Sequence, residues 1–366
     1  MPGPATQPPF AAHAVQLSAW QWLIVSAVVL VVTTAVPAVW SRMEPLPETT
    51  NTRVPFRLGD DYWIFERYAR QPSEGDQTIV LGDSVIWGHY VSKDETLSAH
   101  LNKLSGGDNF YNLGIDGIHP AALAGLVDCY GQAIARRRVV IHCNPLWMSS
   151  PQHDLTSEKE FAFNHPSLVP QFFPRIRCYR EPLSDRLGNV VGRNVTFMSW
   201  ARHLQIAYLG GTDWATWTLE HPRENPLRNV TRVLPSPDEP PSPVPTAEPW
   251  MKQGIKPANL RWVDFTASLQ WESFRRAVEL LRNRKNRVFV VVGPFNEHML
   301  LPASAAAYQS GKQVVAQWLS EQGIPHRMAT VLPSDTYADA SHPLDSGYQL
   351  WAAQLWEDEA FRQFLR

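Results

Sequence analysis

A serine, an aspartate and a histidine stand where the sequence predicts turns at the ends of buried strands. Ser84 follows an apolar run, and Asp339 lies three residues before His342, just ahead of the last predicted helix. Ester cleavage needs a nucleophile, a base that accepts its proton and a group that orients the base. We therefore predict Ser84 as the nucleophile, His342 as the base and Asp339 as the carboxylate that fixes the imidazole tautomer.

The same chemistry needs hydrogen-bond donors for the negative charge that develops on the substrate oxygen. We expect this oxyanion hole to consist of the backbone N–H groups of Ser84 and Gly114 and the side-chain amide of Asn144, which follow three successive predicted strands. Losing one such donor typically slows a reaction about 100- to 1000-fold. Four further side chains near these turns are candidate substrate-binding residues: Asp83, Trp87, Asn296 and His298.

These residues belong to a chain that alternates between short apolar runs and amphipathic stretches. Strands are predicted at 78–81, 109–113, 139–143 and 287–292, and helices at 94–104, 120–136, 266–283, 304–321 and 345–365. Short buried strands separated by helices predict a parallel sheet with helices on both faces. Ligands bind such sheets outside the carboxyl ends of the strands, where the candidate residues stand. The predicted fold class is an α/β, three-layer α/β/α domain over 76–366.

Four sequence blocks resemble those of the SGNH/GDSL hydrolase family. They are the Gly82-Asp83-Ser84 turn, Gly114 within NLGIDG, Asn144, and DASHP with Asp339 and His342. The resemblance covers about 76–150 and 262–366. At 142–145 the chain departs from the family's Gly-x-Asn-Asp pattern and has Pro145 in place of the final Asp. It implies an SGNH-hydrolase-like domain that uses no metal and no cofactor and that cleaves esters or transfers acyl groups.

Residues 151–260 interrupt the strand–helix alternation and contain 15 of the 31 prolines, including those of 235–249. Neither a helix nor an inner strand accommodates such a run of prolines, so we expect an irregular insertion that ends in a proline-rich loop. Tryptophans in or near it could line a sugar groove, although ordinary packing explains them equally well. They are Trp147, Trp200, Trp214, Trp217 and Trp250.

The N-terminal segment carries no charged side chain before Arg42. About 20 apolar residues cross a bilayer as a helix, so we predict a transmembrane helix at 17–40, between an N-terminal tail at 1–16 and a linker and packing segment at 41–75. A cleaved signal peptide is the alternative, because 36–38 resembles a cleavage site, but the start lacks the usual basic residues.

The orientation of this segment stays open. Three arginines that follow it, Arg42, Arg53 and Arg57, would place that side in the cytoplasm on a positive-inside count. The resemblance to the hydrolase family instead implies a domain outside the cytoplasm, which is our expectation.

Composition and spacing argue against several other classes of protein. A net charge of −2 and 11% aromatic residues do not suit a nucleic-acid-coating or disordered chain. The three cysteines show no C-x-x-C spacing, and the histidines near the predicted turns match no zinc signature, so we expect neither a disulfide scaffold nor a metal site. Cys143 could be a thiol nucleophile, but a buried strand cysteine explains it better.

Taken together, these patterns predict a membrane-anchored serine esterase or O-acyltransferase. Its expected substrate is an acylated glycan or another cell-surface ester, and a membrane acyl donor is a candidate partner. The alternative is an inactive binding or scaffold protein of the same fold in a polymer modification or export complex. The presence of all four block residues favours the enzyme.

Overall fold

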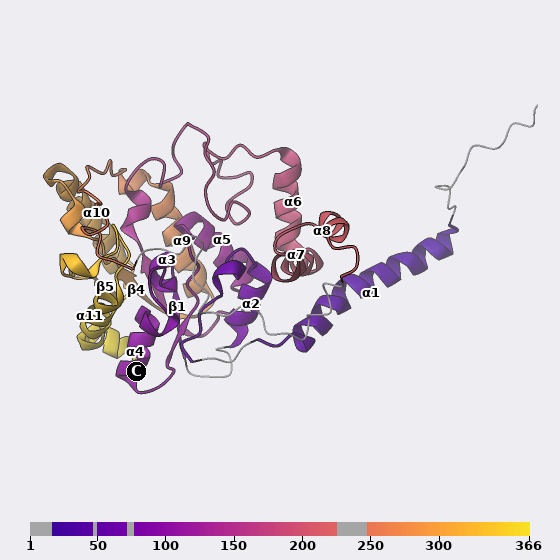
Figure 1. The fold of residues 1–366 in the computed structure, drawn as a ribbon, viewed down its shortest axis with the longest axis horizontal. Coiled ribbons are helices and arrows are strands. Elements are labelled where there is room, and N and C mark those ends of the chain that lie inside the picture. Colours follow the sequence, from indigo (N-terminus) through magenta and orange to yellow (C-terminus); the bar gives the residue numbers. More distant parts are fainter. Residues whose placement is uncertain (1–16, 47–49, 72–76, 225–246) are drawn as a thin grey trace, which may run out of the picture.

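The computed structural model describes residues 17–46, 50–71, 77–224 and 247–366. The predicted tail at 1–16, small parts of the predicted linker and most of the proline-rich loop at 235–249 lie outside these ranges. Within them, five parallel strands form one sheet in the order β2-β1-β3-β4-β5 (Figure 1). The strands are β1 Thr78–Leu81, β2 Phe110–Asn112, β3 Arg138–Cys143, β4 Arg287–Val292 and β5 His326–Met328.

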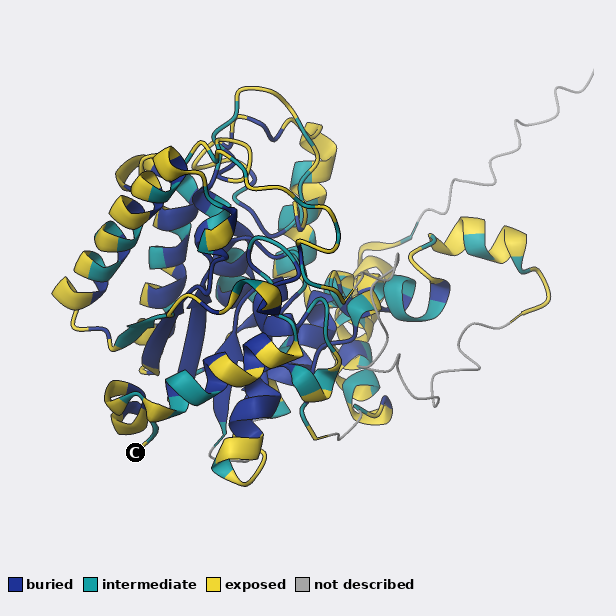
Figure 2. Ribbon diagram, turned by 60° about the vertical axis from the view of Figure 1, so that its left-hand side comes forward, coloured by how far each residue is buried: buried dark blue, intermediate teal, exposed yellow. Residues whose placement is uncertain are grey.

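Helices cover both faces of the sheet because side chains alternate along its strands. Ile79 and Leu81 belong to one core and Val80, between them, to the other. The first core is covered by α2 Tyr62–Arg70, α5 Pro120–Tyr130, α9 Leu269–Asn283 and α10 Pro302–Glu321, and the second by α4 Leu97–Ser105, α11 Asp345–Glu357 and α12 Glu359–Leu365. Figure 2 shows the buried strands between these layers. The predicted three-layer α/β/α fold is confirmed.

Capping side chains explain where the helices differ from the sequence prediction. Thr96 accepts the N–H of Ala99, so α4 begins after Thr96, and Asp94 lies in the preceding 3-10 turn instead of capping the helix. Asp358 caps α12 and so divides the predicted helix at 345–365 into α11 and α12. β5 escaped prediction because its three residues are half-buried and carry no apolar alternation.

In its described parts, 151–224 and 247–260, the predicted insertion contains three helices, α6 Leu183–Asn194, α7 Thr196–Leu209 and α8 Trp214–Glu220. They lie on the side of the domain from which α1 (Ala19–Met43) extends (Figure 1). Within the described ranges α1 is long and apolar enough to cross a membrane, with a mean hydropathy of 2.3 in its best window. The last turns of α1 pack on α7, where Trp40 meets the rings of Trp200 and Tyr208.

A buried cluster of charges joins α1 to the domain. Glu44, which follows α1, has a fully buried carboxylate that accepts hydrogen bonds from Arg67 of α2 and from Tyr208 and His203 of α7, the last at 2.8 Å. The other nitrogen of His203 lies 2.6 Å from Asp61. Burial disfavours a charged imidazole, but the two carboxylates outweigh it and raise the pKa of His203 to about 9. A protonated His203 therefore bridges α1, α2 and α7.

We expect His203→Ala to destabilise the chain by about 3–5 kcal/mol, because it removes the buried cation that Glu44 and Asp61 share. Arg67 then remains as the ion-pair partner of Glu44. The pKa of His203 in the folded protein lies above its usual value of 6.5. Its contribution to stability is therefore complete below pH 6.5 and is lost as the pH rises through about 9. Denaturation of the full chain in detergent, from pH 6 to 9.5, measures both effects. His221→Ala, outside the cluster, is the control. Equal stability of the two variants, with the same pH dependence, would contradict this account.

Candidate active site

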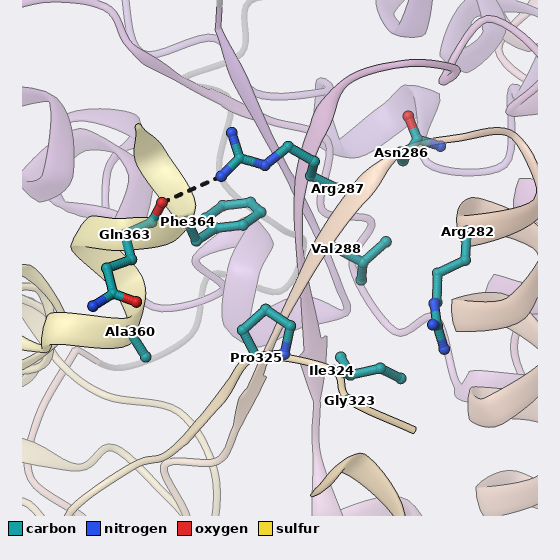
Figure 3. Close-up of a pocket in the computed structure, with 10 residues that line it drawn as sticks. All are labelled: Arg282, Asn286, Arg287, Val288, Gly323, Ile324, Pro325, Ala360, Gln363 and Phe364. Carbon is teal, nitrogen blue, oxygen red and sulfur yellow. Dashed lines mark hydrogen bonds between the residues drawn. The ribbon is translucent and has the colours of Figure 1, made fainter. Parts of the chain in front are cut away.

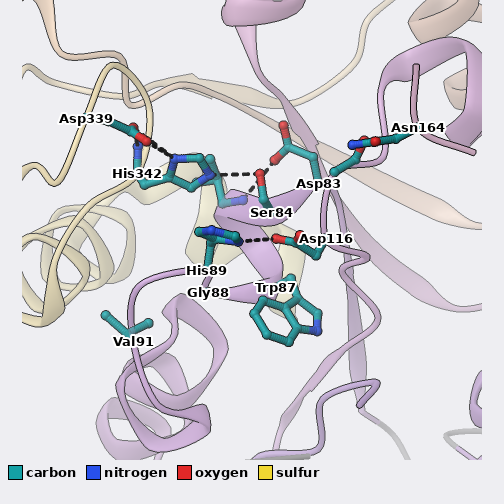
Figure 4. Close-up of polar contacts among 12 residues, drawn as sticks. Asp83, Ser84, Trp87, Gly88, His89, Val91, Asp116, Asn164, Asp339 and His342 are labelled. Atoms are coloured by element: carbon teal, nitrogen blue, oxygen red, sulfur yellow. Dashed lines mark hydrogen bonds and ion pairs between the residues drawn. The ribbon is translucent and has the colours of Figure 1, made fainter. Parts of the chain in front are cut away.

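The structure brings together the three residues predicted as nucleophile, base and orienting carboxylate. Ser84 begins the short helix α3 (Ser84–Trp87) directly after β1. Its hydroxyl oxygen lies 2.8 Å from Nε2 of His342, and Nδ1 of the same ring lies 2.8 Å from each carboxylate oxygen of Asp339 (Figure 4). With Nδ1–H donating to Asp339, the Ser84 hydroxyl donates to the unprotonated Nε2, which is the tautomer that proton transfer from serine requires.

The loop that carries Asp339 is held from two sides. One carboxylate oxygen accepts the backbone N–H groups of Ser341 and His342 at 2.9 and 3.0 Å. From the turn after β4, the Asn296 side chain donates to the Asp339 carbonyl at 3.0 Å, and its backbone N–H donates to the Ala340 carbonyl at 2.8 Å. Asn296 is fully buried, so it positions the loop and does not reach a substrate, contrary to the sequence prediction.

The electrostatics of the pair favour a basic imidazole. Burial disfavours the charged form of both groups, but hydrogen bonds and the charge of His342 hold the pKa of Asp339 well below its usual range. In turn, the carboxylate of Asp339, with smaller contributions from Asp83 and Asp116, raises the pKa of His342 despite its burial. A more basic His342 is the better acceptor for the Ser84 proton.

Asp83 fixes the turn that presents Ser84, and it is not available to a ligand. Its buried carboxylate accepts the Val85 N–H at 3.1 Å, the Asn144 amide at 2.7 Å and the Trp147 indole N–H at 2.8 Å, and it lies 3.2 Å from Nδ1 of His142. Burial opposes ionisation, yet these hydrogen bonds lower the pKa of Asp83. The prediction that Asp83 binds substrate therefore gives way to a structural role.

The three predicted oxyanion donors differ in their availability. Within the described ranges no group accepts the Ser84 N–H. The Asn144 amide has two hydrogens and donates to Asp83 through its nitrogen, which leaves one hydrogen for another acceptor. The Gly114 N–H instead donates to the Asn112 side chain at 2.8 Å. A glycine is required at 114 because the backbone of α3 packs directly against it: an added Cβ would lie 2.5 Å from the backbone nitrogen of Trp87.

The two remaining candidates also point away from a substrate. The Trp87 side chain is 1% exposed and donates its indole N–H to the Val54 carbonyl at 2.7 Å. His298 lies at the surface, where its Nε2 is 3.0 Å from the Leu332 carbonyl. Among the described residues, neither side chain forms a hydrogen bond with Ser84.

A histidine–aspartate pair that the sequence prediction did not include borders Ser84. Nδ1 of His89 lies 2.6 Å from the carboxylate of Asp116, and the ring centroid of His89 is 5.5 Å from that of His342 (Figure 4). The His89 backbone N–H donates to the Ser84 carbonyl at 3.1 Å. The positions of His89 and Asp116 in the sequence could have identified this pair, since each lies a few residues after a predicted strand, close to Ser84 and Gly114.

The other buried groups near the site have partners of their own. The side chain of His119 contacts the Asn164 carbonyl, and burial lowers its pKa to about 3. Nε2 of His142 lies 2.8 Å from the Gly293 carbonyl. Cys143 is fully buried, and burial raises the pKa of its thiol, which keeps it protonated and unreactive.

A separate cavity of about 420 Å³ opens at the other end of the sheet (Figure 3). Its lining includes Arg287 and Val288 at the start of β4, and Phe364 of α12. Parallel strands place their first residues at the edge opposite their carboxyl ends, so this cavity is remote from Ser84.

Comparisons with known proteins do not decide the function. No family model matches the sequence, and no curated protein does. Among solved structures, the chain is similar to a protein from Desulfitobacterium hafniense DCB-2 whose name assigns it to the lipolytic proteins of the G-D-S-L family. The two are 10% identical, with a TM-score of 0.35 over 80% of this chain and 100% of that chain. A likeness this distant carries no functional argument.

Asp83→Ala should destabilise the protein by about 3–5 kcal/mol, because it leaves several buried donors without their charged acceptor. Asp116→Ala is the matched control, because it removes a half-buried carboxylate that contacts the side chain of His89. Chemical denaturation of the two variants measures the difference. An Asp83→Ala variant no less stable than Asp116→Ala would contradict the structural role of Asp83.

Proposed function

We propose that the chain is a membrane-anchored serine esterase or O-acyltransferase that forms an acyl-enzyme on Ser84. One observation carries this proposal. The Ser84 hydroxyl, the His342 imidazole and the Asp339 carboxylate form a continuous hydrogen-bonded chain with 2.8 Å contacts. This is the arrangement of side chains that activates a serine for attack on an acyl carbon.

The geometry supports a two-step reaction. The Ser84 oxygen attacks the carbonyl carbon as its proton moves to Nε2 of His342. The protonated imidazole, stabilised by Asp339, then gives that proton to the departing alcohol, and the acyl group stays on Ser84. In the second step water or a sugar hydroxyl attacks the acyl group, its proton passes to His342, and His342 returns a proton to the Ser84 oxygen. Water gives an esterase and a sugar hydroxyl a transferase.

Two donors are available to stabilise the oxyanion in this scheme. They are the Ser84 backbone N–H and the remaining hydrogen of the Asn144 amide, which the contact with Asp83 holds in place. Preorganised donors of this kind are worth more than flexible ones, because no reorganisation is needed as the charge develops.

An acylated carbohydrate or another cell-surface ester is the substrate class we propose. Of the tryptophans named from the sequence, Trp147 is half-buried and reaches Asp83, next to the nucleophile, at 2.8 Å. An indole ring there offers a flat apolar surface beside the reacting group. Trp200 packs against α1 and Trp250 is buried in the second core, so these two do not line the site.

Fluorophosphonate labelling of the full chain in detergent tests the nucleophile. We expect covalent labelling at Ser84 and hydrolysis of a short-chain p-nitrophenyl ester, both abolished in Ser84→Ala. Ser310→Ala, at an exposed serine of α10, is the control and should retain both. A folded wild-type chain that is neither labelled nor active would overturn the enzyme and favour the scaffold protein.

Asp339→Asn should lower kcat about 10⁴-fold, because the imidazole then favours the tautomer that cannot accept the serine proton. His342 must be neutral to act as the base, so the rate falls as the pH drops through its pKa. Asp339 raises that pKa, and its replacement should move the acid limb of kcat/KM to lower pH. Rates measured from pH 4.5 to 9 show both effects. An unchanged rate and profile would mean that another group orients His342.

A further inference from the structure

Helix α6 turns its polar side toward the protein. Arg186 donates hydrogen bonds to the backbone carbonyls of Gln171 and Tyr179, and its guanidinium lies over the Tyr179 ring. Asn189 donates to the Gln171 side chain at 3.0 Å. Arg193 donates to two backbone carbonyls of the segment that precedes α6, at 3.3 and 3.2 Å. The long polar side chains of α6 are therefore used to attach it to the domain.

The opposite side of α6 is apolar and exposed. Leu183, Leu187 and Val191 recur every four residues, so they share one side of the helix, which we call the outer apolar face. Their exposed fractions are 64%, 50% and 46%. A surface helix of a soluble globular protein has the reverse arrangement, with its apolar stripe on the core. Because the apolar side of α6 faces away from the core, we infer that an apolar environment or partner covers the outer apolar face.

The position of α6 relative to α1 indicates what that is. A cavity of about 720 Å³ lies between α1, α2 and the junction of α6 and α7. Its lining includes Leu30, Thr33 and Pro37 of α1, and 194–197, which span the last residue of α6 and the start of α7. Leu30 precedes Arg42, the first charged residue, by about 18 Å along a helix. The cavity extends along α1 from Leu30 to Arg42, with charged side chains of α2 also in its lining. The end of α6 therefore lies beside this half of α1, which is uncharged up to Arg42.

We propose that α6 lies in the surface of the same bilayer that α1 crosses, with its outer apolar face against the lipid. Interfacial helices of this kind bury their apolar side about 5–10 Å into the boundary between headgroups and acyl chains. The proposal rests on the membrane anchor of the proposed function. It adds a second attachment, which together with the His203 cluster sets the orientation of the domain on the membrane.

Lipid is favoured over a protein partner because exposed apolar side chains extend from the outer apolar face toward α1. Val195, which directly follows α6, is 42% exposed and lines the same cavity as Leu30. Side chains of α1 such as Val28 and Leu30 are 55% and 65% exposed, and acyl chains cover them if α1 spans the bilayer. Helix α7 contacts both α1 and α6, and Asn194, the last residue of α6, lines the cavity beside α1. Figure 1 shows α6, α7 and α8 on the side of the domain next to α1.

Spin labels on the full chain in proteoliposomes test the proposal. Single cysteines are introduced as Leu187→Cys and Val191→Cys on α6, Val28→Cys on α1 and Leu350→Cys on α11, in a Cys129→Ser background, because Cys143 and Cys178 are buried. Leu350 is 41% exposed, similar to the 46% of Val191, and it belongs to α11, which lies on the opposite side of the domain from α6 (Figure 1). It is therefore the matched control. Collisions with lipid-soluble oxygen and with a water-soluble nickel chelate are measured by power saturation.

We expect the ratio of oxygen to nickel accessibility to be severalfold higher at 28, 187 and 191 than at 350. A high ratio at 28 with a low ratio at 187 and 191 would overturn the lipid contact of α6 and leave the anchor standing. A low ratio at 28 would overturn the anchor itself. Exclusion of both agents at 187 and 191 in native membranes would show that a protein covers the face, which also overturns the proposal.

Discussion

The hydrogen bond between the Ser84 hydroxyl and Nε2 of His342 is the contact on which the candidate site depends, because it joins groups 258 residues apart. Parallel strands make this contact possible, since their carboxyl ends meet at one edge of the sheet. Ser84 follows β1, and the turn after β4, through Asn296, holds the loop of Asp339 and His342 at the same edge. The sheet thus converts a long separation in sequence into a 2.8 Å contact.

Buried carboxylates fix the geometry in two places. At the candidate site, Asp83 accepts hydrogen bonds from the turns after β1 and β3, and so links the turn of Ser84 to the Asn144 amide. At the base of α1, Glu44 and Asp61 enclose His203. Such groups are costly to bury unless every partner is present, so each cluster specifies one arrangement of the elements it joins. One cluster therefore holds the candidate site in place, and the other holds the junction between α1 and the domain.

The insertion is the part of the chain whose structure changes the interpretation most. Its sequence favoured an irregular insertion, and its tryptophans were consistent with either a sugar groove or ordinary packing. The structure instead places α6 and α7 beside α1, with arginines directed inward and leucines directed outward on α6. The orientation of a helix on its support decides which side meets solvent, lipid or protein, and composition does not carry that information.

Local patterns in the sequence were enough to predict most of the sheet, both its helical layers and the apolar segment of α1. They also singled out a serine, an aspartate and a histidine that the structure brings together. They succeed because alternation reports burial, and because Asp339 and His342, three residues apart, necessarily lie near each other. Tertiary structure alone decided that the Gly114 N–H is already paired, that Asp83 and Asn296 are structural, and that His89 and Asp116 border Ser84. Each of these depends on a partner far away in the chain, and hydrogen-bonding groups are assigned by packing in three dimensions, not by spacing along the sequence.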